Sequence, residues 1–255
     1  VVDMPALMKV AKKHKIIVLE DFCDAWGSTI NGKKIGSFGH INFTSFHAAH
    51  IIAMGQGGGT FTNNKDLAQK VRMYRDWGRQ ADLTQRKNTK WKKLPYDQNP
   101  RYIYEKIGYN LSPLELQAAM GRVQLRKVEK IKALRKRNFE YFYKELSKFD
   151  DLIMPKWIKG ADICWFGFPI SVLDGRLKLI EYLDKRGIET RTMFTGNVTK
   201  HPAYAKSNYR IGTSLKDANW ILEHSLWFTV HPRYTPKDLK YIVNAFINYY
   251  GFGRV

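Results

Sequence analysis

The stretch IIVLEDFCDAWG, residues 16–27, decides the fold class of this chain. It opens with consecutive apolar residues that predict a buried parallel strand ending at Glu20 and Asp21. A helix is expected just before it, because Asp3 can cap its first turn and Pro5 suits the start of a helix. A helix that leads into a buried strand is typical of an α/β protein, in which sites form at the carboxyl ends of strands. Asp21 is therefore the first candidate site residue.

A second informative stretch is TSFHAAHIIAMGQGGG, residues 44–59. A short strand is predicted at 43–46 and another at 60–62, with a glycine-rich turn between them. Ser45 and His50 lie near the end of the first of these strands. Taken alone, a strand-end serine, a loop histidine or a Glu-Asp pair is more often structural than functional, so the case for a site depends on the two stretches together.

The middle of the chain is predicted to be helical on either side of one long loop. Residues 65–77 are expected to form a helix, and the polar, basic residues 80–101 a loop of a length that is uncommon unless it is functional or mobile. The sequence SPLE at 112–115 combines a capping box with a proline at the first helical position. It opens a helical region with apolar residues near the helical period that continues to about residue 149.

The character of the sequence changes at residue 150, where we place a domain boundary. Residues 1–149 would form a first domain that ends in a bridging helix, and residues 150–255 a small α+β domain. The elements predicted in the second domain are a strand at 165–170, a helix at 176–186, a strand at 187–191 and a last helix at 235–251.

Composition excludes several classes of protein. The 255 residues are 44% apolar, which is typical of globular proteins with real cores. No apolar run approaches the roughly 20 residues of a spanning helix, and no signal peptide is visible, so a cytoplasmic location and no membrane partner are expected. Cys23 and Cys164 are too few for a disulfide framework or a zinc site, and no metal site is expected.

The strong positive charge has two interpretations. The formal charge of +20 reflects 43 lysines and arginines against 23 acidic residues, which could indicate nucleic acid or an anionic ligand such as a nucleotide diphosphate. A generally lysine-rich surface is the other explanation. We favour that explanation, and expect no nucleic-acid partner, because no nucleic-acid-binding motif accompanies the charge.

Together the two quoted stretches resemble the cofactor site of the DegT/DnrJ-type sugar aminotransferases, which use pyridoxal phosphate. The resemblance implies an aspartate-aminotransferase-like fold, the fold type I of the pyridoxal-phosphate-dependent transferases, with part of the large domain followed by a small α+β C-terminal domain. Shorter motifs extend it along the chain, namely RDWGR at 75–79, YIY at 102–104, GYNL at 108–111, QAA at 117–119, WFGFP at 165–169 and TGNVTK at 195–200.

The resemblance places His50 where the family has its cofactor-binding lysine. A histidine there marks one branch, the nucleotide-sugar 3-dehydrases, and the chain is most similar to those acting on CDP-4-keto-6-deoxy-D-glucose. Imidazole cannot hold the cofactor covalently, so pyridoxamine phosphate would bind noncovalently and His50 would act as the catalytic base. The implied function is removal of the C3 hydroxyl from a nucleotide-linked 4-keto-6-deoxyhexose, in deoxysugar and lipopolysaccharide O-antigen biosynthesis.

The same resemblance gives roles to further residues. Asp21 would face the pyridine nitrogen, whose protonation makes the ring an electron sink, and Asp24 would belong to the same cofactor site. Ser45 would bind the cofactor phosphate, and Asn110 would reach that phosphate from a neighbouring subunit, which implies a homodimer. Three residues lie in the segment implied to be near the nucleotide sugar, with plain surface positions as the alternative: Arg191, Asn197 and His201.

Two departures from the family pattern matter. The CDP-sugar enzymes hold a [2Fe–2S] cluster with four cysteines, and only Cys23 matches one of them, while Ala81 and Leu83 occupy the paired positions. One thiolate cannot hold such a cluster, so none is expected. A related dehydratase acting on GDP-4-keto-6-deoxy-D-mannose works without one.

The second departure is that family members have about half a domain more before the Asp21 strand, so the chain is expected to be a fragment of a longer enzyme. Two alternatives to the dehydratase stay open. One is an ordinary sugar aminotransferase, which the absence of lysine at position 50 disfavours. The other is a noncatalytic remnant that binds only a nucleotide sugar or a full-length partner. A reductase is a further candidate partner of the dehydratase.

Overall fold

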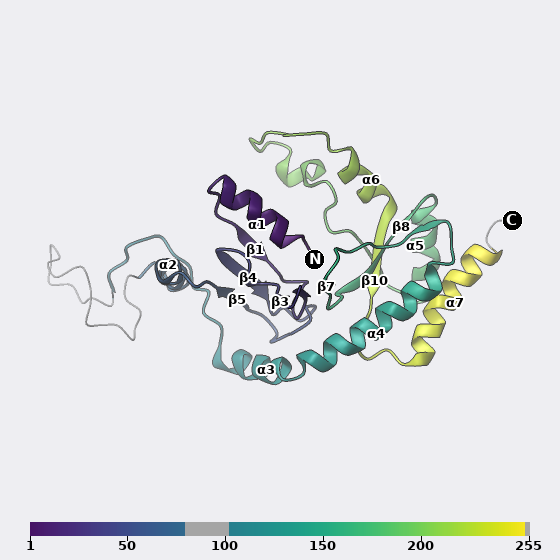
Figure 1. Cartoon of the computed structure of the whole chain (residues 1–255), viewed down its shortest axis with the longest axis horizontal. Coiled ribbons are helices and arrows are strands. Elements are labelled where there is room, and N and C mark those ends of the chain that lie inside the picture. The colour runs from purple at the N-terminus through teal and green to yellow at the C-terminus, as the bar shows by residue number, and fades with distance from the viewer. Residues whose placement is uncertain (80–101, 253–255) are drawn as a thin grey trace. The chain divides into compact units, whose positions relative to one another are not determined.

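The computed structural model describes residues 1–79 and 102–252, which form two compact units (Figure 1). Unit 1 holds residues 1–128 together with 160–162, and unit 2 holds the remainder. The division lies ahead of the predicted boundary at residue 150, because the helix that follows residue 128 packs its aromatic side chains into the core of unit 2. The predicted loop at 80–101 lies outside the described residues.

The main sheet of unit 1 has the order β1-β4-β5, formed by β1 (Leu19–Asp21), β4 (Ile41–Ser45) and β5 (Gly58–Phe61). β1 runs parallel to β4, as the sequence predicts, and β4 runs antiparallel to β5. The expectation that the first strand is buried is wrong. β1 begins only at Leu19 and is an edge strand of this sheet, so Ile16 and Ile17 remain 56% and 63% exposed.

The helices of unit 1 are α1 (Met4–Lys13), α2 (Lys65–Arg75) and α3 (Glu115–Leu125). α1 is capped as predicted, because the carboxylate of Asp3 accepts the N–H of Ala6 at 3.1 Å. The predicted capping box at 112–115 is displaced. The residue before α3 is Leu114, whose N–H donates to Oε1 of Gln117 at 2.8 Å.

A second, smaller sheet of unit 1 brings distant segments together. Its order is β3-β2-β7, and it consists of β2 (Thr29–Ile30), β3 (Lys33–Lys34) and β7 (Ala161–Asp162). All of its pairings are antiparallel. This sheet explains why residues 160–162 belong to unit 1.

Unit 2 is built on an antiparallel sheet of order β6-β8-β10-β9. Its strands are β6 (Leu152–Ile153), β8 (Gly167–Val172), β9 (Thr190–Thr192) and β10 (Ser225–Thr229). Its helices are α4 (Val128–Leu146), α5 (Arg176–Asp184), α6 (Lys216–His224), α7 (Pro236–Phe252) and the short 3₁₀ helices η2 (Val198–Lys200) and η3 (Pro202–Tyr204).

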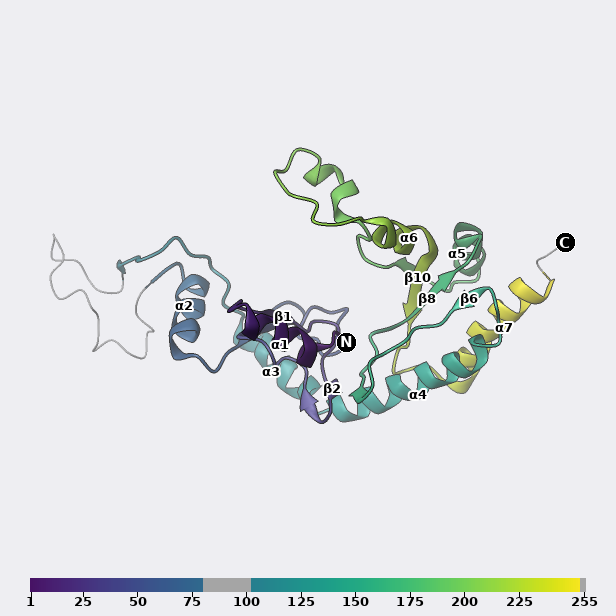
Figure 2. The same ribbon diagram turned by 45° about the horizontal axis from the view of Figure 1, so that its top comes forward.

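The core of unit 2 is aromatic. Phe142 of α4 is fully buried, with its ring centroid 5.7 Å from that of Phe168 and 5.1 Å from that of Phe228. α4 and α7 lie beside each other in both views of the chain and contribute to the same core (Figures 1 and 2). The single long helix predicted for 112–149 is in fact α3 and α4, with a break at residues 126–127. Within the described residues, no helix is long and apolar enough to cross a membrane.

Candidate functional site

The two adjacent carboxylates at the end of β1 lie in opposite environments. Glu20 is 4% exposed, and its carboxylate accepts the backbone N–H groups of Gly36, Phe38 and Gly39 at 2.7, 2.8 and 2.9 Å. The side chain of Asp21 is exposed, because successive residues of a strand point to opposite faces. Glu20 therefore has the structural role that a strand-end acid often has, and Asp21 is available for a ligand.

The turn after β1 is fixed by Asp21 itself, whose Oδ1 accepts the N–H of Cys23 at 2.9 Å. Burial, and then the nearby Asp21 carboxylate, raise the pKa of the Cys23 thiol to about 12. The thiol is therefore protonated at neutral pH and is a poor nucleophile there.

The absence of an iron–sulfur cluster stays a prediction. Among the described residues no group of three or more His, Cys, Asp or Glu side chains could hold a metal ion. Ala81 and Leu83, which the resemblance places at the paired cysteine positions, lie outside those residues.

His50 lies in a loop that follows β4 and is closed by backbone hydrogen bonds. The N–H of Phe46 donates to the carbonyl of Gly57 at 2.9 Å, and the N–H of Met54 donates to the carbonyl of Phe46 at 2.8 Å. Ile51, the next residue after His50, is 5% exposed. The buried neighbour and the two hydrogen bonds at the base of the loop hold His50 in place without burying its side chain.

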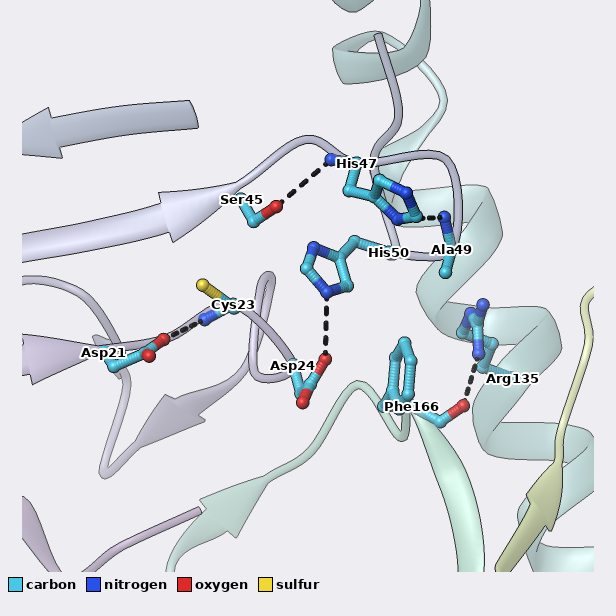
Figure 3. Close-up of polar contacts among 9 residues, drawn as sticks. All are labelled: Asp21, Cys23, Asp24, Ser45, His47, Ala49, His50, Arg135 and Phe166. Carbon is cyan, nitrogen blue, oxygen red and sulfur yellow. Dashed lines mark hydrogen bonds and ion pairs between the residues drawn. The ribbon is translucent and has the colours of Figure 1, made fainter. Parts of the chain in front are cut away.

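The imidazole of His50 faces the carboxylate of Asp24 (Figure 3). Its Nε2 lies 3.6 Å from Oδ1 of Asp24, and the two side chains are 21% and 34% exposed. The pKa of Asp24 is raised, mainly by burial. The charge of His50 lowers this pKa, and the charge of Asp21 raises it further. The hydroxyl of Ser45 accepts the N–H of His47 at 3.2 Å. The structure thus gathers four predicted site residues at the carboxyl ends of the parallel strands β1 and β4: Asp21, Asp24, Ser45 and His50.

Aromatic residues that the sequence analysis did not assign connect the two loops that carry these side chains. Trp26 stacks on Phe22 with a centroid distance of 5.3 Å and packs edge-on against Phe46 at 5.5 Å. Phe61 of β5 completes the group. Phe22, Trp26 and Phe46 stand in the two stretches quoted above and Phe61 in the predicted strand that follows, but their contact depends on tertiary packing that no spacing rule reveals.

Asn110 is exposed, and its chain segment pairs elsewhere. Its backbone forms a bridge with Asp76, and the N–H of Leu111 donates to the carbonyl of Arg75 at 3.0 Å. The segment therefore follows the end of α2 rather than the strands that carry Asp21 and Ser45. Its role toward a cofactor stays a prediction.

The three residues predicted to lie near the nucleotide sugar belong to unit 2. Asn197 is 5% exposed, and its amide is used internally: Nδ2 donates to Asn219 at 2.8 Å, and Oδ1 accepts the N–H of Thr199 at 3.0 Å, which caps η2. These contacts are typical of a structural residue. Arg191 is exposed and paired with Glu189, and Nε2 of His201 lies 3.1 Å from the carbonyl of Thr195.

The family follows from a match that covers nearly the whole chain. The model of the DegT/DnrJ/EryC1/StrS aminotransferase family matches residues 1–247. The chain belongs to this family. Its fold is accordingly that of the fold type I pyridoxal-phosphate-dependent transferases, as the sequence predicts.

Named relatives and solved structures agree with this membership. The chain is 34% identical to the lipopolysaccharide biosynthesis protein RfbH of Salmonella typhimurium, with 98% of this chain and 60% of that protein covered. It is 34% identical to the dTDP-4-dehydro-2,6-dideoxy-D-glucose 3-dehydratase of Saccharopolyspora spinosa, with 94% and 54% covered.

A solved E. coli GDP-4-keto-6-deoxy-D-mannose-3-dehydratase with bound hydrated PLP superposes with a TM-score of 0.85 at 26% identity. The superposition covers 96% of this chain and 64% of that one. The chain therefore spans somewhat more than half the length of the relatives it matches.

Proposed function

We propose that this chain carries the catalytic histidine of a nucleotide-sugar 3-dehydratase that uses pyridoxamine or pyridoxal phosphate. The substrate would be a nucleotide-linked 4-keto-6-deoxyhexose, and the reaction the removal of its C3 hydroxyl. One observation carries the proposal. The imidazole of His50, the residue that the motif resemblance assigns to the family's lysine position, lies in one cluster with Asp21, Asp24 and Ser45. The dehydratase among the named relatives supports it.

The residues of this cluster fit the proposed cofactor in their chemistry. Asp21 is an exposed carboxylate at the end of β1, suited to a protonated pyridine nitrogen. Ser45, at the end of the neighbouring β4, offers a hydroxyl to a phosphate. The crevice at the carboxyl ends of such strands is where ligands bind in α/β sheets. When bound, the cofactor supplies an electron sink for bond cleavage next to the sugar's carbonyl carbon.

The proton transfers are assigned to His50. Imidazole changes charge near neutral pH and can both accept and donate a proton, which few side chains do. We assign it the removal of the proton that starts the reaction and the protonation of the departing 3-hydroxyl oxygen. The neighbouring Asp24 carboxylate lies close enough to stabilise the imidazolium between these two transfers.

The experiment that tests the proposal follows the fate of the C3 oxygen. The natural polypeptide containing these residues is incubated with pyridoxamine phosphate and a nucleotide-linked 4-keto-6-deoxyhexose labelled with heavy oxygen at C3. We expect the label to appear in water. Retention of the label together with a new amino group at C4 would show an aminotransferase instead. Retention with an unchanged sugar would show a noncatalytic binding protein.

We also propose that unit 1 contributes the interface of a homodimer. Large apolar side chains of α3 and of the segment before it are strongly exposed: Ile107 at 91%, Tyr109 at 63%, Leu111 at 65%, Leu114 at 67% and Leu116 at 72%. An exposed apolar surface often marks a protein–protein contact. A symmetric dimer would cover it, and Asn110 belongs to the same segment.

The proposed dimer can be tested by measuring the molar mass in solution. We expect light scattering to give a dimer mass for the natural polypeptide, and Leu116→Asp to shift the protein toward the monomer, because a charge at the interface is costly to bury. Leu177→Asp on α5 is the control, since Leu177 is 64% exposed in unit 2 and should leave the mass unchanged. A monomeric parent protein, or equal effects of the two substitutions, would contradict the proposed interface.

A further inference from the structure

Asp24 has a contact that its predicted role as a cofactor-binding residue does not explain. Its Oδ1 lies 3.6 Å from Nε2 of His50, a distance suited to an ion pair once the imidazole is protonated (Figure 3). Both side chains are partly buried, so water screens their interaction less than on an open surface. The contact therefore links His50, the proposed catalytic residue, to Asp24. The carboxylate expected to face the pyridine nitrogen is a different one, that of Asp21.

The pair is fixed from both sides by the fold. Asp24 lies in the turn after β1 and His50 in the loop after β4, and these two strands are parallel neighbours. Beneath the loops, Trp26 from the first loop packs against Phe46 from the second at a centroid distance of 5.5 Å. The separation of carboxylate and imidazole thus follows from backbone pairing and aromatic packing, and not from two flexible surface side chains.

The other titratable groups near the pair are consistent with a coupled site. Asp21 raises the pKa of Asp24, and the charge of His50 lowers it. The ring of His47 lies edge-on to His50 with a centroid distance of 6.0 Å. Cys23 keeps its proton at neutral pH, because burial and Asp21 raise its pKa to about 12. Of the carboxylates described in this cluster, Asp24 is the one in ion-pair distance of His50.

We propose that Asp24 is the positioning residue of His50. Its carboxylate orients the imidazole and stabilises the positive charge that His50 acquires between accepting and donating a proton, as carboxylates do for histidines in other catalytic pairs. This inference rests on the proposed dehydratase function for its catalytic meaning. The coupling of the two side chains is a separate physical statement that can be measured without substrate or cofactor.

The first test measures that coupling by carbon NMR of the Asp24 carboxyl group during a pH titration. Because the positive charge of His50 lowers the pKa of Asp24, removing it in His50→Gln should raise the pKa of Asp24. An unchanged titration of Asp24 would overturn the proposal. This readout applies even if Asp24→Asn fails to fold, and even if the chain turns out to be an aminotransferase.

The second test uses turnover of the natural polypeptide. We expect Asp24→Asn to lower kcat about 10- to 100-fold, the range seen when carboxylates that orient metal-binding histidines are removed, with KM little changed. The pH profile of kcat should also shift, which loss of a purely structural residue would not cause. Asp217→Asn, an exposed residue of α6, is the control. A dehydratase whose kcat and pH profile survive Asp24→Asn would refute the positioning role while leaving the proposed function intact.

Discussion

Replacing His50 with glutamine is expected to lower the rate of C3 deoxygenation by about 10²- to 10⁴-fold, the usual contribution of a general acid–base residue. Glutamine keeps the size and polarity of the side chain but cannot exchange a proton near neutral pH. Because the loop around His50 is held by backbone bonds of Phe46 and by the buried Ile51, the fold should be retained. Turnover is measured by release of the labelled C3 oxygen, and retention of the fold by circular dichroism.

His47→Gln is the matched control, because His47 lies in the same loop but is exposed and its ring contacts His50 only edge-on. It should keep most of the activity. Equal losses in the two variants would show that the loop, and not the imidazole of His50, matters.

His50→Lys sharpens the same argument. A lysine amine can bind the cofactor covalently, as in the aminotransferases of the family, so this variant should gain a cofactor mass on the peptide around residue 50 after borohydride treatment. The parent protein should not.

The sequence predicts the cluster around His50 well because its members lie in two short stretches whose strands are neighbours. The first strand is parallel, as predicted, and the structure shows that its partner is β4. Once these strands pair, Asp21 and Ser45 must lie at the same edge. Family and fold type are confirmed too. The roles of the individual site residues remain predictions, because the comparisons do not assign them.

What the sequence could not predict depends on contacts between distant segments. A run of apolar residues at 16–19 indicates burial, but β1 begins only at Leu19 and is an edge strand, and Ile16, Ile17 and Leu19 stay exposed. The helical period continues smoothly through residues 112–149, so the break between α3 and α4 leaves no signal in it. Asn197 was expected near the nucleotide sugar, with a plain surface position as the alternative, yet it is buried and its amide donates to Asn219. Each difference reflects tertiary packing that local pattern does not specify.

The neighbouring acids Glu20 and Asp21 give the second large expected effect. Glu20→Gln should lower the free energy of unfolding of unit 1 by about 3 kcal/mol, since a hydrogen bond to a charged group contributes about 1.5–3 kcal/mol and the buried Glu20 carboxylate accepts three from partly buried backbone N–H groups. The amide of glutamine can accept some of these bonds, but its own N–H₂ then faces a backbone donor. Hydrogen exchange at the amides of Gly36, Phe38 and Gly39 should accelerate, because they lose their acceptor.

Asp21→Asn should show the opposite pattern. The asparagine oxygen can still accept the N–H of Cys23. We therefore expect the free energy of unfolding to change by no more than about 0.5 kcal/mol, as for surface substitutions. Binding of pyridoxamine phosphate should weaken by about 10- to 100-fold, because the pyridine nitrogen loses its charged partner. Chemical denaturation and calorimetric titration of both variants decide the matter. Two results would contradict these assignments: normal cofactor binding by Asp21→Asn, or weaker cofactor binding by Glu20→Gln without faster amide exchange at residues 36–39. Either would mean that Asp21 is not the cofactor-binding carboxylate or that Glu20 is not the structural one.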